Sequence, residues 1–121
     1  MQKNVLGGDL QSCCNELETG FYRNGRCETD DHDIGMHTVC AKITQEFLDY
    51  SKANGNDLST AFPEAEFPGL KPGDRWCLCA QRWIEALEEN VAPKIHLQST
   101  HSSVLEYVEL EVLVKYALDI N

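Results

Sequence analysis

The sequence predicts a small α+β fold, in which a mostly antiparallel sheet carries two main helices and a short C-terminal helix. Two amphipathic helical patterns dominate the chain, at about 35–54 and 74–90. Short β-prone runs lie outside these helices, at 4–10, 20–29 and 94–99. Connections rich in Pro and Gly separate the elements. The length of 121 residues suits one domain over residues 1–121.

The N-terminal third is predicted to contribute strands. Residues 4–10 form a short strand that Gly7-Gly8 ends. In the 20–29 run, Asn24-Gly25 predicts a hairpin, because a type I′ turn needs positive φ at both central residues. The acidic run at 30–33 does not fit the spacing of a calcium loop, so we expect a solvated loop there.

The first helix is predicted from about Gly35 to Asn54. Its apolar stripe is Met36, Val39, Cys40, Ile43, Phe47 and Tyr50. Cys40 lies in the middle of this stripe, which indicates a small buried side chain. His37 lies three residues before it on the same side, a spacing that would also suit two ligands of one metal.

The second helix is predicted from Asp74 to about Asn90. Pro72-Gly73 forms a turn, and the Asp74 carboxylate stands where an N-cap should accept the first N–H groups. Its stripe consists of Trp76, Ala80, Trp83, Ile84, Leu87 and Val91. On a regular helix Cys77 and Cys79 point roughly 160° apart, so we predict that they neither bond to each other nor share a metal.

A long connection and a C-terminal region complete the chain. Residues 55–73 lack a regular pattern but hold several apolar side chains, which favours a packed loop over disorder. After Pro93, residues 94–99 alternate as a strand does. A turn of helix at 102–108 and a last helix at about 109–118 follow.

Composition limits the classes of partner. The net charge is −10, and neither nucleic acid nor an anionic membrane suits an acidic surface. No run approaches the ~18 apolar residues of a membrane span, and the first residues lack a signal-peptide core. We therefore expect a cytoplasmic protein. For that reason the six cysteines, which include no C-x-x-C pair, are only weak evidence for disulfides.

Several motifs resemble a family of small uncharacterised proteins found in bacteria and plants, filed as a domain of unknown function. They are NVLGG at 4–8, TGFYRNG at 19–25, HTVCA at 37–41, GNDLST at 55–60 and FPGLKPGDRWCLCA at 67–80. The chain departs from the family where Arg26 replaces the first of two adjacent cysteines and where Ala61 replaces a proline. The resemblance implies a single-domain α+β fold and a bacterial or plastid-like cytosolic setting, and it carries no activity or cofactor.

The leading functional hypothesis is a non-catalytic binding domain for a small ligand or a partner, without a cofactor. Its site would lie where the 55–76 loop meets the second helix, because helix N–H groups and two cations there suit a small anion. The candidate residues are Asn56, Asp57, Ser59, Thr60, Lys71, Asp74 and Arg75.

Two alternatives stay open. We predict no metal site, but a zinc module would draw on His37, Cys27, Cys40 and Cys77, or on Cys79 in place of Cys77. A thiol enzyme or redox protein would use Cys77 or Cys79, which lie close to a predicted helix N-terminus. Whether the protein is an enzyme is not decided by these patterns.

Overall fold

A computed structural model describes residues 2–14, 19–65 and 67–120 of the chain. The strands and α-helices are β1 (His37–Lys42), α1 (Gln45–Ala53), β2 (Arg75–Cys79), α2 (Ala80–Glu88) and α3 (Leu110–Lys115). Short 3-10 helices occupy Pro63–Ala65, Leu97–Ser99 and Ser102–Glu106. Within the described ranges no helix has the length and apolar character that a membrane crossing requires.

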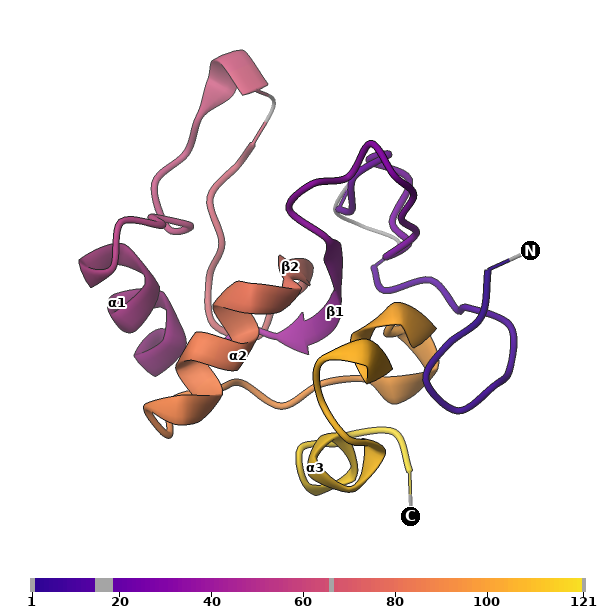
Figure 1. The fold of residues 1–121 in the computed structure, drawn as a ribbon. Helices are drawn as coiled ribbons and strands as arrows, with labels where there is room; N and C mark the ends of the chain where they lie inside the picture. Colours follow the sequence, from indigo (N-terminus) through magenta and orange to yellow (C-terminus); the bar gives the residue numbers. More distant parts are fainter. Residues whose placement is uncertain (1, 15–18, 66, 121) are drawn as a thin grey trace.

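The predicted α+β class is confirmed, with one antiparallel ribbon of β1 and β2 as its sheet. α1 directly follows β1 in the chain, and α2 directly follows β2. The segment before β1 and the long connection before β2 both extend from the ribbon, and α3 lies at the opposite end of the molecule (Figure 1). The ribbon therefore stands between two long loops.

The first predicted helix is wrong in its first half, because residues 37–42 form β1. Residues 38–41 are buried on both faces, so their apolar run carries no strand-like alternation. Thr38 and Val39 are β-branched and favour the strand. The helix begins only after Thr44, whose hydroxyl accepts the Phe47 N–H at 3.1 Å as an N-cap.

The second predicted helix is also a strand in its first part. β2 covers Arg75–Cys79, and α2 begins at Ala80. Asp74 therefore caps no helix, and its carboxylate instead accepts the backbone N–H of Lys71 at 2.9 Å and closes the turn before β2. The end of α2 is close to the prediction, since Asn90 adopts a left-handed φ of 61° just beyond it.

The three other predicted strands are not strands in the described structure. Residues 3–9 form a turn around buried Asn4, whose side chain accepts the Leu6 and Gly8 N–H groups. Residues 20–26 form turns and bends, residues 27–29 have no regular secondary structure, and Ile95 makes only single bridges with Ala41 and Ala117. The turn of helix after His101 and the short C-terminal helix are confirmed.

The main core lies between the ribbon, α1, α2 and the C-terminal segments. Its largest fully buried side chains are Trp83, Phe47, Ile43, Leu48, Leu78, Ile95, Leu97 and Leu113. Trp83 also donates its indole N–H to the Pro93 carbonyl at 3.0 Å and packs edge-on against Tyr116. The predicted burial of Trp83 is thus confirmed, and it joins α2 to the chain that follows.

Trp83→Ala should lower the free energy of unfolding by about 3–5 kcal/mol, because the truncation leaves a large cavity in a fully buried site. A denaturant melt measures this loss. Leu105→Ala, at a 41% exposed position, serves as the control and should change stability by less than about 0.5 kcal/mol. A loss below about 1 kcal/mol for Trp83→Ala would contradict the packing described.

Candidate functional site

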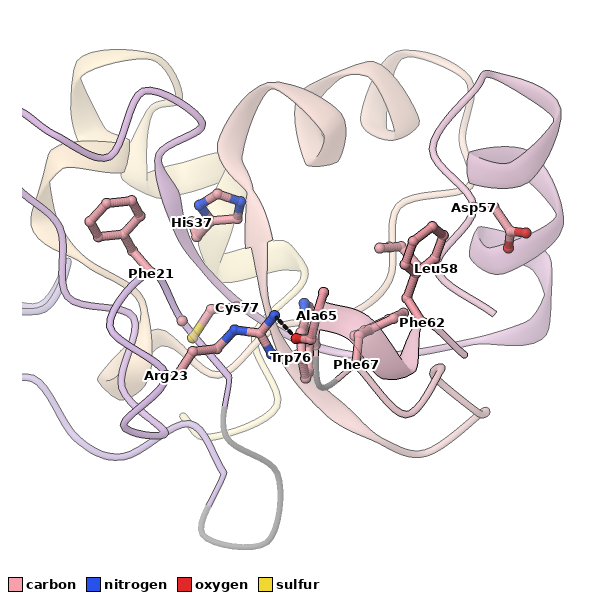
Figure 2. A pocket seen from close by; sticks show the side chains of 11 residues that line it. Phe21, Arg23, His37, Asp57, Leu58, Phe62, Ala65, Phe67, Trp76 and Cys77 are labelled. Carbon is pink, nitrogen blue, oxygen red and sulfur yellow. Dashed lines mark hydrogen bonds between the residues drawn. The ribbon is translucent and has the colours of Figure 1, made fainter. Parts of the chain in front are cut away.

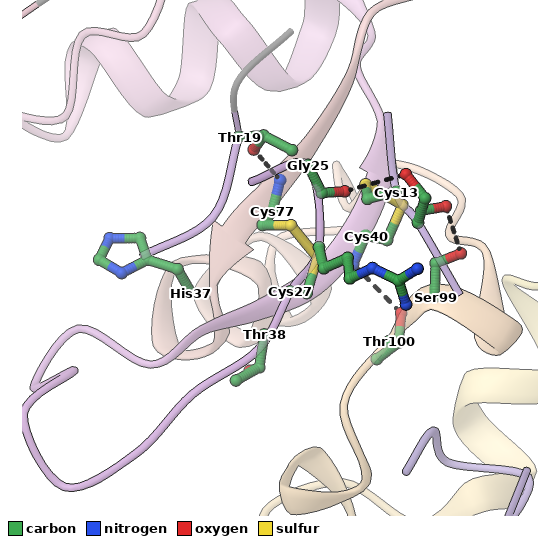
Figure 3. The surroundings of a disulfide bond; sticks show 12 residues. Cys13, Thr19, Gly25, Cys27, His37, Thr38, Cys40, Cys77, Ser99 and Thr100 are labelled. Atoms are coloured by element: carbon green, nitrogen blue, oxygen red, sulfur yellow. Dashed lines mark hydrogen bonds between the residues drawn. A yellow bond between two sulfur atoms is a disulfide. The ribbon is translucent and has the colours of Figure 1, made fainter. Parts of the chain in front are cut away.

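Two disulfides fix the outer face of the ribbon. Cys40 and Cys77 are partners across β1 and β2, yet each bonds outward to a loop. The bridges are Cys13–Cys40 and Cys27–Cys77, with Cα atoms 5.6 Å and 5.3 Å apart. All four residues are completely buried and form their own cluster (Figure 3). The sequence-based view of disulfides as weakly supported is therefore corrected, because that view depended only on compartment.

Backbone groups beside the bridges are satisfied by threonine hydroxyls. The Cys77 N–H donates to Thr19 Oγ1 at 2.8 Å, and the Cys40 N–H donates to Thr100 Oγ1 at 3.1 Å. Both threonines are fully buried. Figure 3 shows them on separate segments that reach the ribbon from different sides. The hydroxyls thus supply acceptors at positions where the two-stranded ribbon has no further strand.

Gly25 brings the N-terminal segment close to the turns at 20–26, of which it is part. Its carbonyl accepts the Cys13 N–H at 2.7 Å and the Cys14 N–H at 3.1 Å. A Cβ atom at Gly25 would lie 2.3 Å from the Cys14 carbonyl oxygen, and the residue has a φ of 83°. Only glycine fits this approach, so the glycine of the expected hairpin positions Cys13 for its disulfide.

A groove runs between the two long loops and along β2. We call its first part the aromatic lobe, a cavity of about 360 Å³, and its second part the polar lobe, of about 260 Å³. Both lobes share the wall His37, Leu58, Trp76 and Cys77. The aromatic lobe adds Gly20, Phe21, Arg23, Asp57, Phe62, Ala65 and Phe67. The polar lobe adds Gly35, Asn56, Leu78, Cys79 and Arg82.

Arg23 and Trp76 hold the two walls of the aromatic lobe together. The Arg23 guanidinium lies 5.8 Å from the centre of the Trp76 ring and donates to the Ala65 carbonyl at 3.3 Å. Phe67 packs edge-on against Trp76 with ring centres 5.3 Å apart. In Figure 2 Phe21 and His37 lie on one side of the groove, and Leu58 and Phe62 on the other. The lobe is therefore a preformed aromatic slot.

His37 enters the shared wall with a fixed orientation. Its Nδ1 lies 2.7 Å from Asp33 Oδ1, and its backbone N–H donates to Asp33 Oδ2 at 2.9 Å. Thr29 Oγ1 donates to the same Oδ2 at 3.0 Å. The Asp33 side chain is completely buried, whereas the His37 side chain is 42% exposed. A buried carboxylate thus anchors an imidazole that faces the groove.

Asp57 is a turn-forming residue as well as a lining residue. Its carboxylate accepts hydrogen bonds from the Thr60 hydroxyl at 2.6 Å and from the Ser59 hydroxyl at 2.8 Å. These bonds, that from Thr60 first, lower the pKa of Asp57 to about 2. The cluster shapes the beginning of the long loop and places Leu58 in both lobes.

The structure brings only part of the predicted site together. Asn56 and Asp57 line the groove. Neither lobe includes the other five candidates, Ser59, Thr60, Lys71, Asp74 and Arg75. Ser59 and Thr60 bond to Asp57, and Asp74 closes a turn at Lys71. The helix N-terminus expected at Asp74 does not exist there, so its N–H groups cannot hold an anion at that position.

The alternative metal ligands are partly clustered. Cys27, Cys40 and Cys77, three candidate ligands of the zinc alternative, lie in one buried cluster, and Cys13, which was not a candidate, joins them. Three of these sulfur atoms, on Cys13, Cys27 and Cys77, lie within 4.8 Å of one another. Both disulfides consume their thiols, so they offer no thiolate ligand in this state. Figure 3 shows His37 pointing away from the cluster.

Sequence reasoning missed the residues that come from other segments, chiefly Phe21, Arg23 and Arg82. They reach the groove only through the tertiary arrangement, and no spacing in the sequence links them to Trp76. The TGFYR motif at 19–23 is part of the family resemblance, but its pattern predicts a hairpin and gives no sign that it forms one wall of a groove.

Comparison with known proteins identifies a family without an assigned activity. The model of the family DUF2237, described as an uncharacterised protein conserved in bacteria, matches residues 3–117. The chain belongs to this family. No curated protein matches the sequence. Membership in DUF2237 confirms the resemblance inferred from the motifs.

The Asp57 carboxylate should show its lowered pKa directly. Its folded pKa of about 2 lies below the ~3.9 of an unfolded Asp, so its contribution to stability is present above pH ~4 and is lost as pH falls toward 2. NMR titration of the carboxylate carbon should give a midpoint near 2. Asp49, which accepts one bond from Gln45, serves as a comparison on α1. A midpoint near 3.9 for Asp57 would contradict the hydrogen-bonded turn.

Reduction of the disulfides should destabilise the fold strongly. The bridges join residues 27 and 50 positions apart, so the chain-entropy model assigns each about 3.5–4 kcal/mol. Cys27→Ser/Cys77→Ser and Cys13→Ser/Cys40→Ser should each lower the free energy of unfolding, whereas Cys14→Ser should not. An equal free energy of unfolding for the wild type with and without reductant would contradict the presence of the two disulfides. Recovery of stability when zinc is added to the reduced wild type would favour the metal alternative.

Proposed function

We propose that this DUF2237 domain binds a small ligand that has a flat apolar part and a negatively charged end. The observation that carries the proposal is the two-lobed groove over Trp76. Its aromatic lobe, at about 360 Å³, falls within the range of small-molecule sites. The walls of the groove come from four separate segments, those of Phe21, His37, Leu58 and Trp76, as is usual for a site that the fold assembles.

The aromatic lobe supports an apolar, planar ligand part. Phe62 is 59% exposed and Phe21 is 38% exposed, although both are large apolar side chains. Together with Phe67 and Trp76 they line one cavity, and clustered exposed apolar side chains are typical of binding sites. A flat ring bound between these side chains would remove their exposed faces from water and would pack against them in offset-stacked or edge-to-face contacts.

The polar lobe supports a carboxylate or similar anion at the other end of the ligand. Among the described residues, Arg82 uses only Nη1 in hydrogen bonds, to the Asn54 carbonyl and to Glu85. Its remaining N–H groups can meet a carboxylate in the two-pronged manner that guanidinium favours. Asn56 lines the same lobe and adds an amide donor. The anion predicted from the sequence is thus retained, with Arg82 in place of Arg75 and Lys71.

Benzoate and indole-3-carboxylate are suitable first probes, with benzamide as the uncharged match. Binding should shift tryptophan fluorescence and raise the melting temperature, and Arg82→Gln should weaken benzoate binding about tenfold through the lost charged hydrogen bonds. Phe62→Ala should weaken all three probes. Arg75→Gln and Ile34→Ala are matched controls, since both positions are exposed and lie outside the two lobes.

Two results would overturn the proposal. One is the absence of any shift with all three probes at millimolar concentration. The other is an equal loss of affinity in Arg82→Gln and Arg75→Gln, because this would show a general charge effect of the acidic protein and not a site.

A further inference from the structure

Cys79 occupies an unusual place for a cysteine outside the disulfides. It is the last residue of β2 and the N-cap of α2, and it lines the polar lobe while half-buried. Four of the six cysteines are consumed in bridges, and the remaining one, Cys14, lies on the N-terminal segment. Of the two thiols, only Cys79 opens into the groove described above.

The partner of Cys79 across the ribbon is His37. The two residues are paired at the end of the antiparallel register, beside an irregularity between His37 and Val39. Both residues line the polar lobe. The described structure shows no hydrogen bond between them, and such catalytic bonds are often long without substrate and shorten when it binds.

The orientation of His37 suits a proton acceptor. Asp33 Oδ1 faces Nδ1 at 2.7 Å, so a carboxylate there keeps the ring proton on Nδ1. Nε2, the other ring nitrogen, makes no hydrogen bond within the described residues and is the atom that can accept a proton. The same carboxylate accepts Thr29 Oγ1 and the His37 N–H, which fixes the anchor itself. A histidine base that a buried carboxylate holds in place is the arrangement that activates the nucleophile in many enzymes.

Gly35 preserves the space that the imidazole occupies. A Cβ atom at this position would lie 2.7 Å from His37 Cε1 and 3.2 Å from Nε2. Since Asp33 pins the other side of the ring, a side chain at 35 would push the imidazole out of its place. Gly35 also lines the polar lobe, so the backbone approaches the ring directly.

The first turn of α2 offers hydrogen-bond donors to an anion at Cys79. This helix has nine residues, and the Cys79 side chain makes no capping hydrogen bond. The Ala80 N–H donates to the Met36 carbonyl at 3.0 Å. The N–H groups of Gln81 and Arg82 have no partner in the described part of the chain and point toward the N-terminal end of the helix.

We propose that Cys79 is a nucleophilic thiol, that His37 deprotonates it while Asp33 holds the His37 ring in place, and that Cys79 exchanges with small disulfides that carry a carboxylate. His37 Nε2 takes the Sγ proton, and the thiolate attacks one sulfur of the bound disulfide. A new bond joins Sγ to that sulfur, the old sulfur–sulfur bond breaks, and the leaving thiolate receives the proton from His37. Cys79 is oxidised to a mixed disulfide, and the departing half of the substrate is reduced to a thiol.

A disulfide is an electrophile that needs no further oxidant, because its own sulfur–sulfur bond supplies the oxidising equivalents of the exchange. Arg82 in the same lobe would bind the substrate carboxylate. The proposal does not need the aromatic lobe to be filled, but it rests on the same Arg82 anion site as the ligand proposed above, and the Cys79→Ser measurement below separates the two.

The test uses the non-reduced Cys14→Ser protein, in which Cys79 is the one thiol left. Iodoacetamide and oxidised glutathione are the probes, and intact mass follows the modification with time. At neutral pH the folded protein should react faster than the same protein unfolded in urea. His37→Gln should slow both reactions roughly tenfold or more, and Asp33→Asn should slow them less. His32→Gln is the matched control, because exposed His32 contacts Asp30 in a similar way at 3.4 Å.

Two further measurements separate activation from mere structural support. At a pH of about 9.5 an ordinary thiol is already ionised, so His37→Gln should react at the rate of its parent there. Arg82→Gln should remove the preference for oxidised glutathione over cystamine, a disulfide with positive ends. Equal neutral-pH rates in His37→Gln and its parent, or slower reaction in the folded than in the unfolded protein, would overturn the proposal. Cys79→Ser should still bind benzoate, which distinguishes failure of the thiol from failure of the groove.

Discussion

The pairing of β1 with β2 is the constraint on which the rest of the molecule depends. Two strands alone are marginal in water, because they leave edges unpaired and bury little surface. Here one face of the ribbon meets the helical core, and the other face is covered by the disulfides. The bridges attach two irregular segments to that face, and threonine hydroxyls complete its hydrogen bonding. The loops are thereby ordered without further strands.

The groove follows from the same arrangement. The turn at 19–25 is held by the Cys27–Cys77 bridge, and the long loop is held by its apolar contacts and by the Asp57 turn. Both walls therefore converge on Trp76, on a strand and not on a helix end. His37 and Cys79 sit at the end of the ribbon nearest the start of α2. The register of the two strands therefore sets the positions of both the binding surface and the reactive groups.

The α+β class, the family, the burial of Trp83 and the late part of each helix could be predicted from the sequence. The strands could not, because residues 38–41 and 76–78 are buried on both faces and show no alternation that separates a strand from a helix. The error at Asp74 moved the expected anion site to a helix end that does not exist. Loop composition alone indicated Asn56 and Asp57, which line the groove, whereas Arg23 and Arg82 could be found only from the tertiary structure. The expected cytoplasmic setting remains a prediction, and the complete burial of the bridged sulfurs would slow their attack by soluble thiols there.

The order of the bridged cysteines along the chain has a consequence for how the protein matures. Cys27 lies inside the loop closed by Cys13 and Cys40, and Cys77 lies outside it, so the two covalent loops overlap and neither encloses the other. Four cysteines allow three pairings. The ribbon sets Cys40 directly beside Cys77, and a bond between them would be the nearest wrong choice. Each native bridge can close only when its own N-terminal segment has reached the ribbon, whereas the wrong Cys40–Cys77 bond needs nothing beyond the pairing of β1 with β2.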